Sequence, residues 1–140
     1  MTTSQGVTNV NFILESFVRK VRGIAHAVVV SADGLLMAKS PGIDPRAADQ
    51  VASVASGLVS IAGSGGRVLG AGTLRQVMVE VDAGYLFFMA ISNGSCLAAI
   101  ADQTCDVGPA GYEMAMVAKR FGTVLTPALV TELRNAIVAG

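Results

Sequence analysis

The sequence predicts an α+β fold in which a five-stranded antiparallel sheet carries helices on both faces, as a three-layer sandwich. The predicted order is helix, two strands, helix, three strands, helix, helix. The three strand-like runs in the middle of the chain are joined by connections of a few residues, too short for the crossover that parallel strands require. Each helix carries apolar residues that need a sheet face to cover them, so both faces are expected to be occupied.

The first helix is predicted from Val10 to about Arg22, because its apolar residues recur in steps of three and four. Basic residues in the last turn and Gly23 just after it indicate its end. Residues 1–8 are polar and are expected to form a disordered N-terminal tail. The 140 residues are expected to form a single domain.

A hairpin and a second helix are predicted next. Two apolar, β-branched runs, near residues 26–32 and 35–40, flank Asp33-Gly34, a dipeptide that favours a tight hairpin turn. Asp44 suits the N-cap of the following helix and Pro45 its first position. The apolar residues of this helix run from Ala47 to Ala62, and its other face is small and nearly uncharged, with Asp49, Gln50, Ser53, Ser56, Gly57 and Ser60.

Three strands and two helices complete the chain. The strands are predicted in residues 74–82, 84–92 and 95–101, and valines at every second position give the first of them one apolar face. A helix is predicted from Gly108 to Phe121, with Gly122 as its end. Thr126-Pro127 opens a short final helix within residues 126–140.

The composition excludes several classes of protein. Ten basic and ten acidic side chains cancel, so there is no basic field to bind nucleic acid. No apolar run is long enough to cross a bilayer, and the N-terminus lacks the basic start of a signal peptide. A soluble, cytoplasmic protein is expected. Charged residues make up only 14% of the chain, against about 25% on average, so we expect a second copy or a partner to cover part of the surface.

The sequence offers little that could do chemistry, so no enzyme, cofactor or metal is expected. The single histidine, His26, has Ser31 and Asp33 near it in sequence, but an extended strand separates them beyond contact. Glu80 and Asp82 stand two apart and could act as a carboxylate pair, although polar residues on an exposed strand face are the commoner case. Cys96 is expected to be a small core residue and Cys105 a loop thiol.

The glycine-rich stretch Gly63–Gly72, GSGGRVLGAG, raises the question of a phosphate site. Val68 stands where a dinucleotide fingerprint needs its third glycine, and no lysine follows as a P-loop requires. The stretch also follows a helix and precedes a strand, so no helix N-terminus faces it. It is predicted to join the second helix to the third strand, and the sequence leaves open whether the helix continues through Arg67.

The chain resembles the Roadblock/dynein-light-chain family, and more closely its bacterial, actinobacterial and Mgl-B-like branch. The resemblance spans roughly Val10 to Arg134. It depends on the order of the segments and on their residue patterns, and no short catalytic motif supports it. These segments are VVVSADGLLMA, AADQVASVASGLVSIA, RQVMVEVDAGYLFFMAI, LAAIAD and GYEMAMVAKRFGTVLTPALVTELR.

The resemblance implies a homodimer with second helices side by side and sheets joined through the third strand. It also implies a non-enzymatic scaffold or activator of a small Ras-like GTPase, with a histidine-kinase-like sensor among its partners and recruitment to the inner membrane face through them. The surface carried over is Asp49, Gln50, Ser53, Ser56, Gly57, Ser60, Arg67, Arg75, Gln76, Val77, Met78, Val79 and Glu80. The alternatives are a small-molecule sensor and a purely structural dimerisation module.

Overall fold

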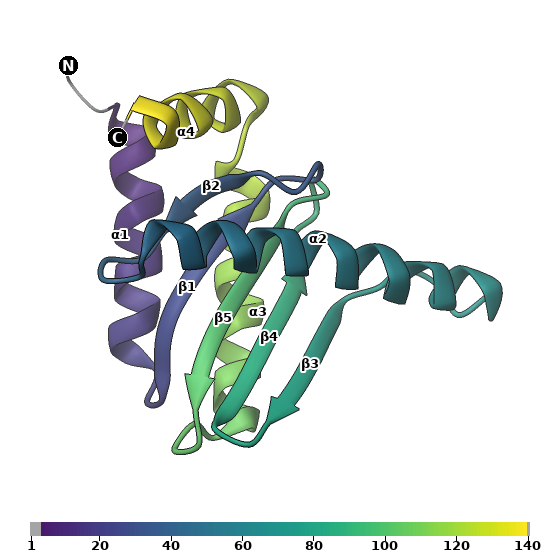
Figure 1. Ribbon diagram of the computed structural model, residues 1–140. Coiled ribbons are helices and arrows are strands. Elements are labelled where there is room, and N and C mark those ends of the chain that lie inside the picture. Colours follow the sequence, from purple (N-terminus) through teal and green to yellow (C-terminus); the bar gives the residue numbers. More distant parts are fainter. Residues whose placement is uncertain (1–3, 140) are drawn as a thin grey trace.

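The computed structural model describes residues 4–139 and shows one five-stranded antiparallel sheet with four helices (Figure 1). The strand order across the sheet is β2-β1-β5-β4-β3. In chain order the elements are α1 (Gln5–Lys20), β1 (Ile24–Val30), β2 (Leu36–Lys39), α2 (Pro45–Val68), β3 (Gln76–Val81), β4 (Gly84–Ala90), β5 (Cys96–Asp102), α3 (Val107–Val124) and α4 (Pro127–Ala139). The predicted fold class is confirmed.

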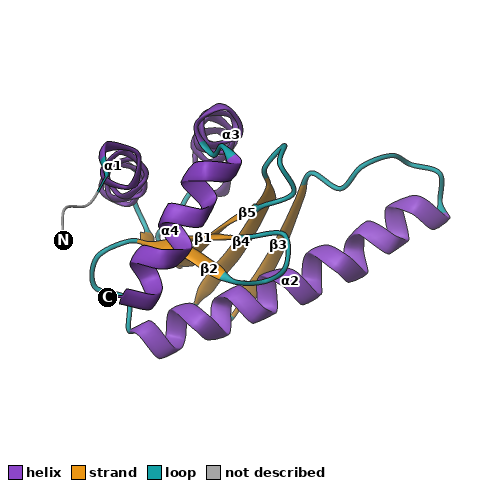
Figure 2. Cartoon of the chain, turned by 90° about the horizontal axis from the view of Figure 1, so that it is seen from above, coloured by secondary structure: helices purple, strands orange, loops and turns teal. Residues whose placement is uncertain are grey.

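The helices form two layers around the sheet (Figure 2). α2 alone crosses one face, whereas α1 and α3 lie on the other, and α4 packs against β2 and α1. Side chains alternate accordingly along β1, where Ala27 and Val29 join the core beneath α1 and α3, while Val28 and Val30 join the core beneath α2. β2 and β3 are the two outer strands of the sheet, and α2 crosses its face toward β3 (Figure 1).

The first helix begins earlier than the sequence predicts. Ser4 caps α1 by accepting a hydrogen bond from the Val7 backbone N–H at 3.2 Å, and Val7 is buried. The prediction of a disordered tail over residues 1–8 is therefore wrong for residues 5–8, because a serine N-cap and a buried valine hold that turn in place. Residues 1–3 of the predicted tail lie outside the described residues.

The third helix continues past the glycine that was predicted to end it. α3 runs to Val124, and Gly122 lies inside its last turns. A Cβ added to Gly122 would lie 2.6 Å from the Ser92 hydroxyl, so this glycine permits the close approach of the β4–β5 turn. The prediction that Gly122 ends the helix was therefore wrong, because this glycine, inside the helix, allows a close contact and does not mark its end.

The second helix continues through the glycine-rich stretch. α2 is 24 residues long and ends at Val68, so Gly63, Gly65 and Gly66 are all helical. Gly70 and Gly72, which follow, have φ values of 63° and 98°, as expected for glycines that turn the chain back toward β3. The last turns of α2 project beyond β3 (Figure 1).

Candidate interaction surface

The face of α2 that packs on the sheet is made mainly of small residues, with Val59 half-buried among them. Ala48, Ala52 and Ala55 are all buried, at steps of three and four. Since alanine side chains let a helix approach a sheet closely, the larger side chains of α2 are left on its two flanks. These flanks differ in chemistry and form the candidate site together with β3.

One flank of α2 is polar and faces the hairpin turns. We call it the polar flank, consisting of Asp49, Ser53, Ser56, Ser60 and Arg67. A Cβ on Gly34, in the β1–β2 turn, would lie 3.0 Å from the Ser56 hydroxyl oxygen. A hollow of about 220 Å³ lies between the flank and the turns, with Ser31, Ser56, Ser60 and Gly94 in its wall.

The opposite flank of α2 is apolar and largely uncovered. We call it the apolar seam, made of Val51, Val54, Leu58, Ile61 and Val68, with Gly65 at the remaining position. Val54, Ile61 and Val68 are 46%, 74% and 86% exposed. Val51 and Leu58 are half-buried against the core beneath α2. Large aliphatic side chains in this number are unusual on a helix flank that faces water.

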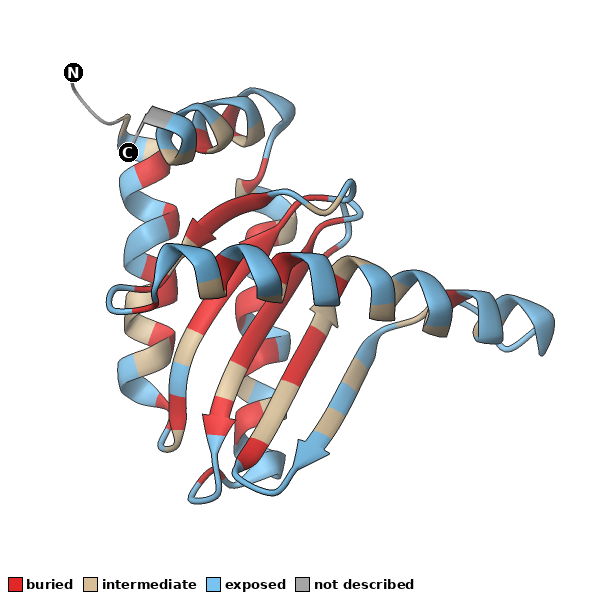
Figure 3. Ribbon diagram, in the orientation of Figure 1, coloured by how far each residue is buried: buried red, intermediate tan, exposed pale blue. Residues whose placement is uncertain are grey.

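The sheet beside the apolar seam is also poorly covered. α2 crosses the sheet near the hairpin turns and leaves the other half of that face open (Figure 3). Val77, Val79, Leu86 and Ile100 lie there, half-buried, on three successive strands; we call these four residues the sheet floor. The outer edge of β3 pairs with no strand of the described chain, and an unpaired edge of this kind is a template for another strand.

The structure divides the predicted surface into several parts. Asp49, Ser53, Ser60 and Arg67 are exposed on the polar flank, Ser56 there is half-buried, and Gln50 and Gly57 are exposed between the two flanks. The remaining residues lie in β3 and just before it, and successive side chains along this strand point to opposite faces of the sheet. Arg75, Gln76, Met78 and Glu80 are exposed, whereas Val77 and Val79 are half-buried in the sheet floor.

The sequence reasoning missed the apolar seam. It assigned every apolar residue of α2 to one core-facing stripe, yet only Ala48, Ala52, Ala55 and Gly63 of the helix are buried. The signal was present, because the large aliphatic residues follow their own steps of three and four, displaced around the helix from the alanines. Treating alanine separately from valine, leucine and isoleucine would have found the seam.

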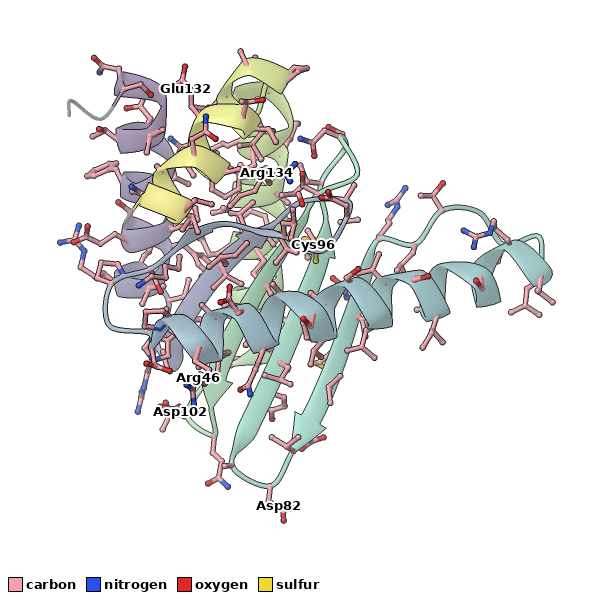
Figure 4. The ribbon with its side chains drawn as sticks, turned by 45° about the horizontal axis from the view of Figure 1, so that its top comes forward. Arg46, Asp82, Cys96, Asp102, Glu132 and Arg134 are labelled. Atoms are coloured by element: carbon pink, nitrogen blue, oxygen red, sulfur yellow. The ribbon has the colours of Figure 1, made fainter. Side chains whose placement is uncertain are left out.

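The residues considered for chemistry do not assemble into a site. His26 is half-buried within β1, and its Nδ1 atom is buried without a hydrogen-bond partner. Asp82 lies in the β3–β4 turn at the end of the sheet away from α2 (Figure 4). Within residues 4–139, no group of three or more His, Cys, Asp or Glu side chains could hold a metal ion.

The two thiols are both free and buried. Cys96 begins β5 and faces the core beneath α2, as predicted, and burial raises the pKa of its thiol to about 11. Cys105 lies in the β5–α3 loop, also as predicted, but it is packed into the core on the other face. Desolvation, and then the charges of Asp102 and Asp106, raise the pKa of Cys105. Neither thiol is poised to react as a nucleophile.

A second hollow lies on the other side of the molecule. It measures about 260 Å³ and is formed by α1, β2 and α4, with Val7, Met37 and Leu133 in its apolar wall. Ligand pockets commonly measure about 300–1,000 Å³, so this hollow gives the small-molecule alternative little support. Separately, none of the helices described in residues 4–139 is long and apolar enough to span a membrane.

Comparison with solved structures finds bacterial proteins of the same fold. A Roadblock/LC7 domain from Streptomyces avermitilis is 39% identical, with a TM-score of 0.75, over 79% of this chain and 92% of that chain. The gliding protein MglB of Thermus thermophilus gives a TM-score of 0.78 at 13% identity, over 89% of this chain and 93% of that one. MglB of Myxococcus xanthus gives 0.74 at 16% identity, over 84% and 94%.

The sequence itself gives the same family. A comparison with curated proteins finds no match. The family model of the Roadblock/LC7 domain matches residues 13–101, which extends from the middle of α1 to the end of β5 and contains α2 and β3. The chain therefore belongs to the Roadblock/LC7 domain family.

Proposed function

We propose that the protein is a non-enzymatic homodimer that binds a small Ras-like GTPase and modulates its nucleotide cycle or its recruitment in bacterial signalling. The family relationship supports this proposal. The observation that carries it is the division of α2 into two exposed flanks of opposite chemistry beside the unpaired edge of β3. An apolar flank suits a permanent contact between copies, whereas a polar flank suits a partner that binds and leaves.

The GTPase is assigned to the polar flank. Its serines present short hydroxyl groups, which can donate or accept hydrogen bonds. Asp49 and Arg67 are its only charged residues. Few strongly hydrated charged groups therefore lose their water when a partner binds there. The turns that contain Gly34 and Gly94 lie beside this flank, so their backbone groups add to the surface available to a partner.

Arg67 is assigned a binding role and not that of an arginine finger. Its guanidinium donates a hydrogen bond to the Ser64 hydroxyl oxygen at 3.0 Å, on the same helix. A finger inserted into a GTPase active site accelerates hydrolysis by about 10³-fold or more. We expect Arg67→Ala to reduce any stimulated hydrolysis by a much smaller factor.

The test is a calorimetric titration with small Ras-like GTPases from the same organism. Each GTPase is loaded with GDP in one series and with a non-hydrolysable GTP analogue in the other. Saturable binding in at least one nucleotide state is expected. Absence of binding in both states, with a folded GTPase that exchanges nucleotide normally, would overturn the proposed partner.

A further inference from the structure

The two hairpin turns beside the polar flank have the same construction. In each turn, two backbone hydrogen bonds of 2.8 Å and 3.0 Å close the loop, and a glycine adopts a positive φ, 84° at Gly34 and 90° at Gly94. The turns lie side by side at one end of the sheet (Figure 1), and a Cβ added to Gly94 would lie 3.4 Å from the Ala32 Cβ atom. Both turns line the hollow at the polar flank, so their position determines the shape of that surface.

The β1–β2 turn is joined to α4 by a chain of three polar side chains. The Ser31 hydroxyl oxygen accepts a hydrogen bond from the Leu35 backbone N–H at 3.1 Å, and the same hydroxyl donates to the Asp33 carboxylate. With its other oxygen, Asp33 pairs with the Arg134 guanidinium of α4, at 3.8 Å between Oδ2 and Nη2 (Figure 4). The hydrogen bond from Ser31 and, to a smaller extent, the charge of Arg134 lower the pKa of Asp33. Asp33 is therefore ionised at neutral pH and can hold both partners.

The β4–β5 turn is joined to the residue that precedes α4. Asn93 accepts a hydrogen bond from the Ser95 backbone N–H at 2.9 Å, and its Nδ2 atom donates to the Leu125 carbonyl oxygen at 3.4 Å. Leu125 is buried and lies between α3 and α4. Asp33 and Asn93 occupy equivalent places, each one residue before the glycine of its turn. In each turn, one side chain therefore connects the turn to α4 or to the residues that lead into it.

α4 itself is held mainly by apolar packing. Leu129 and Leu133 are buried in the core beneath α1 and α3, and Ile137 packs against the core beneath α2. The hollow of about 260 Å³ between α1, β2 and α4 shows that this packing is incomplete. Segments with few buried apolar contacts open most readily. We therefore expect α4 to leave its place more readily than α1 or α3.

We propose that α4 regulates the polar flank, because its docked position fixes both hairpin turns where they shape the hollow beside that flank. Arg134 and Asn93 are the positioning residues of this arrangement, Arg134 through Asp33 and Asn93 through the Leu125 carbonyl group. This proposal rests on the proposed GTPase contact at the polar flank and adds a means of regulating it. A signal that displaces α4 then lowers the affinity for the GTPase without contacting α2.

Two alanine variants, Arg134→Ala and Asn93→Ala, test the two connections separately while Leu129 and Leu133 keep α4 in place. Exposed ion pairs are weak, so Arg134→Ala should lower the affinity for a small Ras-like GTPase by about two- to fivefold in calorimetry. Loss of a hydrogen bond in Asn93→Ala should lower this affinity by about two- to tenfold. Arg134→Lys keeps the positive charge and should recover most of the loss, which a general effect of substitution at this position would not do.

Hydrogen exchange of backbone amides, followed by NMR in the protein without GTPase, tests the same connections independently of the partner. The Leu35 amide should exchange faster in Arg134→Ala, and the Ser95 amide should exchange faster in Asn93→Ala, each by a factor similar to the loss of affinity. Arg120→Ala is the matched control, because Arg120 is an exposed arginine of the neighbouring helix α3. It should change neither the exchange rates in the turns nor the affinity.

The two measurements distinguish failure of this proposal from failure of the proposed function. Unchanged exchange in both alanine variants would overturn the positioning role of α4, whether or not a GTPase binds. Faster exchange with unchanged affinity would overturn the regulation of the polar flank, as would an equal loss of affinity in the control. Absence of GTPase binding by the unmodified protein would overturn the proposed function itself.

Discussion

Replacing Ile61 with alanine should weaken the homodimer without harming the fold. Burying an isoleucine side chain fully contributes about 1.5–3 kcal/mol, and 74% of Ile61 is exposed in the single chain. Burying this exposed part of Ile61 in the dimer therefore contributes about 1–2 kcal/mol per copy, or about 2–4 kcal/mol for both copies. At about 1.4 kcal/mol per tenfold change, the dissociation constant should rise roughly 30- to 1,000-fold.

The assay is sedimentation velocity over a range of protein concentrations, with circular dichroism to verify the helix content. Alanine favours helix more than isoleucine does, so α2 should persist in Ile61→Ala. Gln50→Ala is the matched control, because Gln50 is exposed on the same helix but lies off the apolar seam. A dissociation constant for Ile61→Ala equal to that of the control would refute the assignment of the seam to the dimer contact.

Three further predictions concern the polar flank, the buried thiol and a close backbone contact. Ser53→Arg should lower GTPase affinity at least tenfold in calorimetry while leaving the dimer intact, and an equal loss in Asn9→Arg, on α1, would contradict a specific role for the flank. Because the pKa of Cys96 is raised from 9.0 to about 11, the thiol's contribution to stability is complete below pH 9. That contribution should fall by about 2–3 kcal/mol as the pH rises toward 11. The free energy of unfolding measured in urea should therefore decrease less steeply with rising pH in Cys96→Ala than in the unmodified protein. Equal pH dependence in the two proteins would contradict this prediction. Gly84→Ala should destabilise the fold by at least about 2 kcal/mol in urea, because its Cβ would lie 2.0 Å from the Ala101 carbonyl oxygen. Gly111→Ala, with no atom within 4 Å, should be neutral or stabilising, and a similar loss in both variants would refute the steric explanation.

The order of the elements could be predicted from the sequence because each has a strong local signal. The Asp33-Gly34 turn, the Asp44-Pro45 helix start and the alternating valines of β3 all depend on neighbours in the chain. The errors at α1 and α3 arose where contacts decided the boundary. Val7 packs into the core and extends α1 toward the N-terminus, and Gly122 approaches Ser92 without ending α3.

The division of α2 into two flanks depended on geometry that periodicity alone does not contain. Both the buried alanines and the exposed Val54 and Ile61 follow helical steps, and only the direction of the sheet distinguishes them. The length of α2 was similarly undetermined, because three glycines lower helix propensity. The helix nevertheless continues to Val68 in the structure, which places the apolar end of α2 beyond the sheet.

Sedimentation velocity of the unmodified chain, alone and mixed with a small Ras-like GTPase from the same organism, tests the central claim most directly. Alone, the protein should sediment with twice the mass of the 14.3 kDa chain at micromolar concentration. With the GTPase in its binding-competent nucleotide state, the boundary should move to a heavier species that contains both proteins. A 14.3 kDa monomer that does not sediment with the GTPase in either nucleotide state would contradict the account.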